Sequence, residues 1–125
     1  MFIRTATDAA ELLVPLLSGC EREMVIAAHL DSDMRLIETS EARYGSRDQV
    51  ELPIRSIIED ALRLGSAGLI VAHNHPSGDP HPSREDLEAT RKLASTAQNL
   101  DIRLHDHLIV GADGDCRSLQ ALGLL

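Results

Sequence analysis

The segment GLIVA, from Gly68 to Ala72, is an unbroken apolar run that ends directly at His73, and it constrains the fold more than any other part of the sequence. A run of this length that stops at a polar residue is typical of a buried β-strand. Residues 24–30 (MVIAAHL) and 103–110 (RLHDHLIV) have a similar character. The three runs therefore predict three strands.

Residues that favour turns and loops flank these strands in the sequence. Residues 31–33 (DSD) favour a turn, so we expect residues 34–39 to be the hairpin partner of the strand at 24–30. Residues 40–49 (SEARYGSRDQ) are polar and contain one glycine, and we interpret them as a loop or an irregular edge. Residues 111–115 (GADGD) predict another turn, which a short strand and a helical end should follow.

The first predicted helix covers AAELLVPLL, residues 9–17, whose apolar side chains crowd into successive helical turns. Thr7 or Asp8 is the predicted N-cap, because a side-chain oxygen there can accept a hydrogen bond from the free amides of the first turn. Pro15 lies late in the segment and is expected to limit the helix.

Two further helices are predicted downstream. Residues 54–64 (IRSIIEDALRL) carry an apolar stripe, with Pro53 placed for the first turn and Gly65 for the end. Ser83 is the predicted N-cap of a helix that runs to about residue 99, and the acid three residues later is close to a capping box. Helices alternate with strands along 125 residues, so we predict a single domain of mixed α/β class.

The charge of the chain limits its expected partners. The net charge is −8, and nucleic-acid affinity comes mostly from basic groups, so direct binding of DNA or RNA is not expected. Cys20 and Cys116 form no CxxC pattern, which argues against a disulfide scaffold and against a cysteine zinc site. No signal peptide is visible, and no stretch approaches the ~18 apolar residues of a membrane-spanning helix. These features predict a cytoplasmic domain without a membrane span.

The residues best suited to chemistry lie in HNHPSGDPHPSRED, which follows GLIVA. His73 and His75 are two residues apart, so both imidazoles point the same way from an extended backbone. Asp86 lies in the first turn of the next predicted helix and points back toward this loop. Two nitrogens and one oxygen leave a fourth tetrahedral position open for water, which is typical of a catalytic zinc site. Such a water becomes a nucleophile near neutral pH, and a carboxylate must take and return its proton.

The same residues resemble a known family. HNHPSGDPHPSRED fits the JAMM metalloprotease pattern H-x-H-x7-S-x2-D, and GLIVAHNHPSGDPHPSRED and HDHLIVG resemble the RadC-like JAB domain of bacteria, over roughly residues 20–123. The resemblance implies a JAB1/MPN fold of the cytidine-deaminase-like type, with a mixed, strongly curved sheet and helices on both sides. RadC proteins usually carry an N-terminal helix-hairpin-helix region, and we expect residues 1–125 to form one JAB/MPN domain without it.

The resemblance also implies roles for individual residues. Ser83 would support the oxyanion that develops during amide cleavage. An upstream glutamate, at the start of a strand after the first helix, would act as general acid and base. Glu23 fits this position best and Glu21 is its rival, since both share one face of an extended chain. One zinc ion per chain would be held by three ligands: His73, His75 and Asp86.

These observations predict a zinc-dependent hydrolase that cleaves a peptide or isopeptide bond in an unidentified peptide or protein. The alternative is a metal-stabilised interaction module that partners DNA-processing proteins and has no hydrolase activity. A metal-dependent nuclease is disfavoured by the net charge. A homodimer is compatible with a short domain that has edge strands. Asn74 is expected to serve a turn or a hydrogen bond, and the Asp106-His107 pair to be structural or to support a metal ligand.

Overall fold

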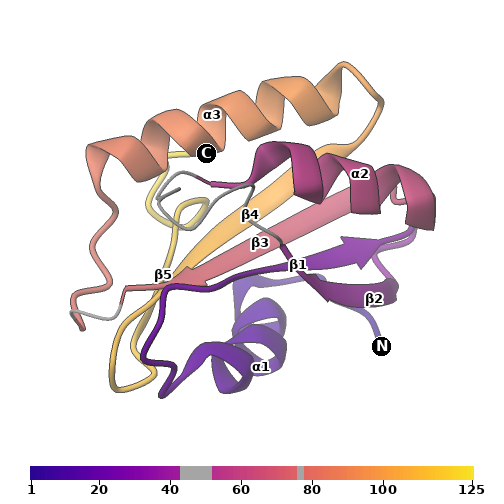
Figure 1. Cartoon of the computed structure of the whole chain (residues 1–125). Helices are drawn as coiled ribbons and strands as arrows, with labels where there is room; N and C mark the ends of the chain where they lie inside the picture. Colours follow the sequence, from indigo (N-terminus) through magenta and orange to yellow (C-terminus); the bar gives the residue numbers. More distant parts are fainter. Residues whose placement is uncertain (43–51, 76–77) are drawn as a thin grey trace.

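The apolar runs form the inner strands of a five-stranded sheet in the computed structural model, which describes residues 1–42, 52–75 and 78–125 (Figure 1). Helices α1, α2 and α3 cover this sheet. In chain order the elements are α1 (Ala6–Leu17), β1 (Val25–Leu30), β2 (Leu36–Glu41), α2 (Ile54–Leu64), β3 (Gly68–Asn74), α3 (Arg84–Gln98), β4 (Arg103–Val110) and β5 (Cys116–Ser118).

The sheet is mixed, and its strands lie in the order β2-β1-β3-β4-β5. β3 and β4 are parallel, whereas β1 is antiparallel to β2 and to β3, and β5 is antiparallel to β4. Parallel neighbours need a long crossover connection, and α3 supplies it between the end of β3 and the start of β4. This arrangement confirms the predicted mixed α/β class.

Helices lie on both faces of the sheet, as expected: α2 and α3 lie above it in Figure 1 and α1 lies below. Each face has its own apolar core. Successive residues of β1 and β3 alternate between the two cores, which explains why these strands are apolar throughout. The core on the side of α2 and α3 includes Val25, Ala27, Ile57, Ala61, Leu69, Val71, Leu93 and Ala97. The core on the side of α1 includes Ala9, Leu13, Leu17, Ile26, Ala28, Ile70, Ala72 and Leu108.

A β-bulge in β4 decides which way its side chains point. The register with β3 shifts between Leu69 and Ile70, and β4 carries one extra residue there, His105. Beyond the bulge, His107 points toward α3, while the next residue packs in the core beside α1. The His105 ring approaches Gly68 so closely that a Cβ on Gly68 would lie 2.5 Å from its Nε2.

The start of α1 differs from the prediction. The N-cap is Thr5, and neither Thr7 nor Asp8 holds this position. Asp8 is the third helical residue, where its carboxylate accepts a hydrogen bond from the backbone N–H of Thr5 while the Thr5 hydroxyl accepts one from the N–H of Asp8. This is a capping box, which uses an acid inside the helix. Pro15 lies within the helix, which continues to Leu17.

The β1–β2 hairpin forms as predicted, but β2 begins later and ends later than residues 34–39. A carboxylate oxygen of Asp31 accepts hydrogen bonds from the backbone N–H groups of Asp33 and Arg35, so the turn extends further along the chain. The strand then runs to Glu41, so the predicted loop at 40–49 begins too early, and residues 43–49 lie outside the described part of the chain.

The other two helices agree closely with the sequence. α2 occupies Ile54–Leu64 as predicted, with Pro53 at the N-cap position and with Gly65 in the left-handed conformation at φ 67°. α3 begins after the predicted N-cap, Ser83. The helical end expected after β5 is a series of turns. Within the described ranges, no helix is long and apolar enough to cross a membrane.

Candidate metal centre

Three side chains that the sequence singled out converge at the end of β3. His73 lies in β3, His75 follows the strand, and Asp86 lies in the first turn of α3. The two Nε2 atoms are 2.9 Å apart, and the Asp86 carboxylate reaches His73 Nε2 at 3.2 Å and His75 Nε2 at 3.1 Å. The structure thus brings together the residues of the predicted ligand set, and one ligand atom from each lies within 4.8 Å of the others.

The helix start holds the Asp86 carboxylate in place. The Ser83 hydroxyl accepts a hydrogen bond from the backbone N–H of Asp86 at 3.0 Å, and Asp86 Oδ2 accepts one from the N–H of Ser83 at 2.8 Å. This capping box was close to the pattern expected from the sequence. Burial disfavours ionisation of Asp86, but the adjacent His73 ring and the hydrogen bonds from Ser83 outweigh it and hold the pKa of this carboxyl well below its usual range. Asp86 therefore offers a carboxylate at neutral pH.

The donor set suits a metal ion. Two imidazole nitrogens and a carboxylate oxygen are common ligands of divalent transition metals. The His73 side chain is 3% exposed, whereas His75 and Asp86 are 18% and 16% exposed. One side of the cluster therefore reaches solvent, which gives an entry path for an ion and for a further ligand. This group could hold a metal.

The remaining predicted residues lie near this cluster without joining it. Ser83 is the N-cap of α3, and its hydroxyl oxygen accepts a hydrogen bond from Asp86. Glu23 and Glu21 are exposed in the segment before β1. In the part of the chain that the structure describes, the group of candidate ligands consists of the two histidines and Asp86, without either glutamate.

His107 and Thr90 extend the cluster into the protein. His107 Nε2 lies 2.7 Å from His73 Nδ1, and His107 Nδ1 lies 2.6 Å from the Thr90 hydroxyl oxygen. Burial, reinforced by the neighbouring His73, lowers the pKa of His107 to about 3, so the ring is neutral at neutral pH. The sequence assigned His107 a structural or ligand-supporting role, but it missed Thr90. The spacing from Asp86 could have indicated Thr90, since residues four apart share a helix face.

Asn74 lies between the two histidines and connects β3 to the segment before β1. Its side-chain oxygen accepts a hydrogen bond from the backbone N–H of Met24 at 2.6 Å. Its side-chain nitrogen donates to the backbone oxygens of Arg22, at 2.9 Å, and Cys20, at 3.3 Å. These contacts bear out the predicted hydrogen-bonding role of Asn74. They also fix the chain on both sides of Glu23.

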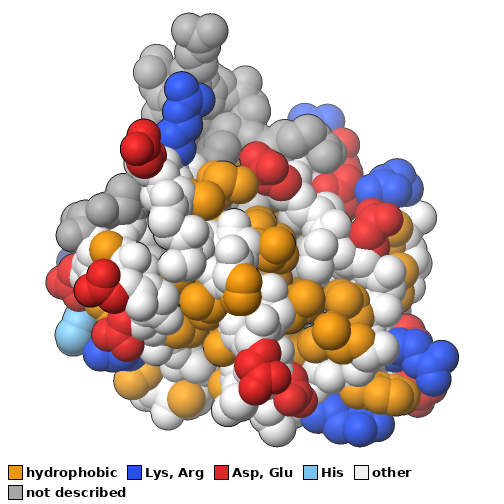
Figure 2. All heavy atoms as spheres, turned by 90° about the horizontal axis from the view of Figure 1, so that it is seen from below, with side chains coloured by type: hydrophobic (Ala, Val, Ile, Leu, Met, Phe, Trp, Pro, Cys, Tyr) orange, Lys and Arg blue, Asp and Glu red, His pale blue; other side chains and the backbone are white. Residues whose placement is uncertain are grey.

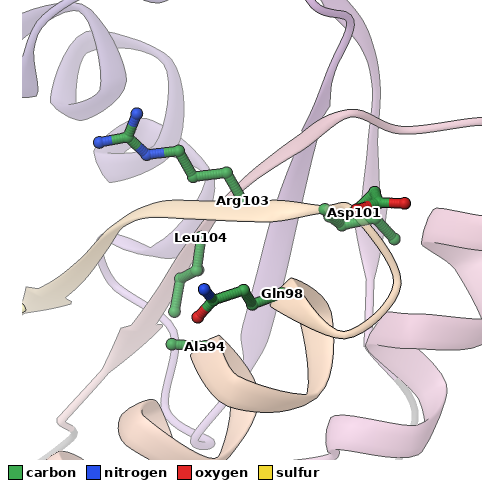
Figure 3. Close-up of a pocket in the computed structure, with 6 residues that line it drawn as sticks. Ala94, Gln98, Asp101, Arg103 and Leu104 are labelled. Carbon is green, nitrogen blue, oxygen red and sulfur yellow. The ribbon is translucent and has the colours of Figure 1, made fainter.

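Other surface features lie away from the cluster. A pocket of about 410 Å³ lies beside the C-terminal end of α3 (Figure 3). The helix rises ~1.5 Å per residue, so this end is about 18 Å from Asp86. Figure 2 shows the face that carries α1, where hydrophobic side chains lie among acidic and basic ones, on the opposite side of the sheet from α3. The residues that line the pocket are Ala94, Gln98, Asp101, Ile102, Arg103 and Leu104.

Curated relatives match most of this chain. A UPF0758 protein of Chloroflexus aurantiacus is 39% identical over 122 residues, which is 98% of this chain and 53% of the relative. A UPF0758 protein of Coxiella burnetii is 43% identical over 118 residues, 94% of this chain and 52% of the relative. A UPF0758 protein of Vibrio cholerae is 40% identical over 110 residues, 88% of this chain and 69% of the relative.

The chain spans about half the length of the first two of these curated relatives. The RadC-like JAB domain family matches residues 3–124, a longer stretch than the resemblance in the sequence indicated, since it also includes α1. The family assignment rests on this match over nearly the whole chain, together with the five-stranded mixed sheet. The chain belongs to the RadC-like JAB domain family.

Proposed function

We propose that the chain binds one zinc ion through His73, His75 and Asp86 and hydrolyses a peptide or isopeptide bond. The observation that carries this proposal is the convergence of three metal-ligand atoms on one partly exposed point. Two histidines and one carboxylate form a ligand set that zinc accepts readily in catalytic sites, with a position left open.

The register of the sheet supports Glu23 as the acid and base. Val25 of β1 pairs with His73 of β3 in an antiparallel ladder. If this register is continued by two residues, Glu23 comes level with His75. Side chains two residues apart share a face, so Glu23 would point to the side of the sheet that carries α3. Glu21 is a further two residues from the ladder, which favours Glu23 by reach.

A zinc ion at this site would acidify a water molecule and polarise the scissile carbonyl. The Glu23 carboxylate would take a proton from the water as its oxygen bonds to the carbonyl carbon. The Ser83 hydroxyl, which accepts its capping hydrogen bond through oxygen, keeps its own proton to donate to the developing oxyanion. Glu23 would then return the proton to the leaving amine, so that amide and water give a carboxylic acid and an amine.

The metal part of the proposal is tested by elemental analysis of the purified chain. We expect close to one zinc per chain in the wild type and loss of zinc in Asp86→Ala. Asp8→Ala is the matched control, because Asp8 has the same capping-box position in α1 and, among the described residues, belongs to no group of candidate metal ligands. Absence of zinc from the wild type after reconstitution contradicts the proposal.

The catalytic part is tested with peptide and isopeptide libraries. We expect Glu23→Gln to abolish cleavage while zinc content stays at the wild-type level, and Glu21→Gln to retain cleavage. The opposite ranking of the two variants would assign the acid and base to Glu21. A zinc-loaded wild type that cleaves none of these substrates favours the alternative, a metal-stabilised interaction module.

A further inference from the structure

We infer that Thr90 and His107 are positioning residues that fix the tautomer of His73, so that its Nε2 lone pair faces the ligand cluster. This inference rests on the proposed metal binding for its purpose, but the hydrogen-bond chain that carries it is present in the protein alone. This chain of hydrogen bonds begins at the backbone oxygen of Asp86 and passes through the side chains of Thr90 and His107. It ends at His73, whose ring lies next to the Asp86 carboxylate.

The direction of the chain is set at its first link. The Asp86 backbone oxygen can only accept a hydrogen bond, so the Thr90 hydroxyl, 2.6 Å away, must donate its proton there. With that proton used, the Thr90 oxygen can only accept at its second short contact. His107 Nδ1, also 2.6 Å away, must therefore carry a hydrogen and donate it to Thr90.

The remaining links follow from the two nitrogens of each ring. A neutral imidazole carries one N–H, so His107 Nε2 is a bare acceptor when Nδ1 donates. His73 Nδ1, 2.7 Å from it, must then donate, which leaves His73 Nε2 with its lone pair. His75 reaches the same state separately, because its Nδ1 donates to the backbone oxygen of Asp79 at 2.8 Å.

The consequence is a cluster built of acceptors. Two Nε2 lone pairs 2.9 Å apart, with a carboxylate about 3 Å from each, repel one another unless a cation lies between them. Hydrogen bonds from the outer ring nitrogen to a protein acceptor are the usual means of orienting metal-bound histidine. For His75 the acceptor is a loop carbonyl. For His73 the acceptor is the buried ring of His107 in β4, which Thr90 of α3 holds in place.

Histidine tautomers are measured directly by long-range ¹H–¹⁵N correlation spectra. In the wild type we expect His107 to carry its proton on Nδ1, both with and without zinc. Thr90→Val removes the acceptor at nearly constant shape, so a substantial population of His107 should move its proton to Nε2. Thr90→Ser keeps the hydroxyl and should restore the wild-type spectrum. A wild-type His107 protonated on Nε2 would overturn the inference.

Metal affinity provides the second readout, with zinc itself as the probe and a chromophoric chelator as competitor. Loss of an outer-ring hydrogen-bond partner typically weakens metal binding roughly 10–100-fold, and we expect a weakening of that order in Thr90→Val and in His107→Phe. His107→Gln, whose amide oxygen can accept from His73, should recover part of the affinity. When cobalt replaces zinc in the protein, the visible absorption spectrum of Thr90→Val should also differ from that of the wild type.

Thr96→Val is the matched control. Thr96 lies on the same helix and donates the same type of hydrogen bond, to the backbone oxygen of Lys92 at 2.8 Å, and within the described residues it makes no hydrogen bond to a histidine. It should leave zinc affinity and the His107 spectrum unchanged. Equal zinc affinity in Thr90→Val, Thr96→Val and the wild type contradicts the inference. A wild type that binds no zinc contradicts the proposed function instead, while the tautomer spectra still test the hydrogen-bond chain.

Discussion

The side-chain oxygen of Asn74 accepts a hydrogen bond from the backbone N–H of Met24 at 2.6 Å, and so joins the strand of the candidate metal ligands to the segment that carries Glu23. All polar atoms of the Asn74 amide are used, because its nitrogen holds the backbone oxygens of Cys20 and Arg22. A residue between two candidate ligands thus holds the neighbouring segment, and Asn74 contacts the backbone on both sides of Glu23, the candidate acid and base.

Asn74→Ala should destabilise the domain while leaving zinc content unchanged. The substitution leaves a part-buried N–H and two carbonyl oxygens without their partner, which typically costs about 1–3 kcal/mol in unfolding free energy. Urea unfolding of the variant and the wild type measures the difference. Asn99→Ala, at an exposed helix end, is the control and should change stability by less than about 0.5 kcal/mol. Equal stability of Asn74→Ala and the control contradicts this account.

Ser83→Ala should lower both stability and zinc affinity, whereas Thr5→Ala should lower stability alone. Each serves as the N-cap of a helix through the same capping box, and loss of such a cap costs about 1 kcal/mol. Only the Ser83 box holds a candidate metal ligand in its first turn. If zinc binding must order the uncapped first turn of α3 at that cost, zinc affinity falls by up to about fivefold. Zinc competition assays on both variants separate the two effects, and equal zinc affinities would argue that the α3 cap does not order the site.

Chelation of the metal should lower stability without unfolding the domain. The two cores lie on either side of the sheet and contain none of the candidate ligands, so the chain can fold without the ion. Zinc at 100 times its dissociation constant should add about 2.7 kcal/mol to the unfolding free energy. Thermal unfolding with zinc and with a chelator measures this, and Asp86→Ala should show no response to zinc. A chelated protein without the circular dichroism of folded structure contradicts this prediction.

His29 should make the domain less stable as the pH falls. Its side chain is fully buried, with its ring nitrogens 2.9 Å from the hydroxyl oxygens of Ser66 and Ser40. Burial lowers the pKa of His29, which the carboxylates of Asp60 and Glu38 oppose and Arg63 reinforces.

Above pH 6.5 or so His29 is neutral in both the folded and the unfolded chain and contributes no pH dependence. Below it, the unfolded chain binds a proton that the folded chain excludes, so unfolding free energy falls by at most about 1.4 kcal/mol per pH unit until the folded pKa is reached. Urea unfolding from about pH 8 to about pH 5 should give a shallower slope for His29→Gln than for the wild type. His81→Gln, at an exposed histidine, is the control. A wild-type slope in His29→Gln contradicts the assignment.

The convergence of the three candidate ligands was predictable because their spacing is local. His73 and His75 share a face of an extended chain, and Asp86 belongs to a first turn that Ser83 marks in the sequence. The start of α1 was not predictable with the same certainty, because an acid is favourable both at an N-cap and at the third helical position. In the structure Thr5 is the N-cap and Asp8 is the third helical residue. The presence of Asp8 in the sequence does not by itself show which of the two positions it occupies.

The contact between His73 and His107 could not be read from spacing. It depends on the parallel pairing of β3 with β4, on the crossover through α3 and on the bulge at His105. A strict alternation along RLHDHLIV gives no sign of that extra residue. The sequence therefore identified the candidate ligands and the family. The hydrogen bond from His73 to His107 could be recognised only from the register of the folded sheet.

The crossover through α3 also sets an order of events during synthesis. The ribosome releases the two histidines of the β3 region first, then Asp86, and only later His107. Parallel strands cannot pair until the whole connection between them exists, so a nascent chain that ends before β4 cannot form the His73–His107 contact. In a partly synthesised chain, His75 can already bond to the Asp79 carbonyl, whereas His73 lacks the acceptor that His107 provides for its Nδ1. The complete site becomes available only in the finished domain.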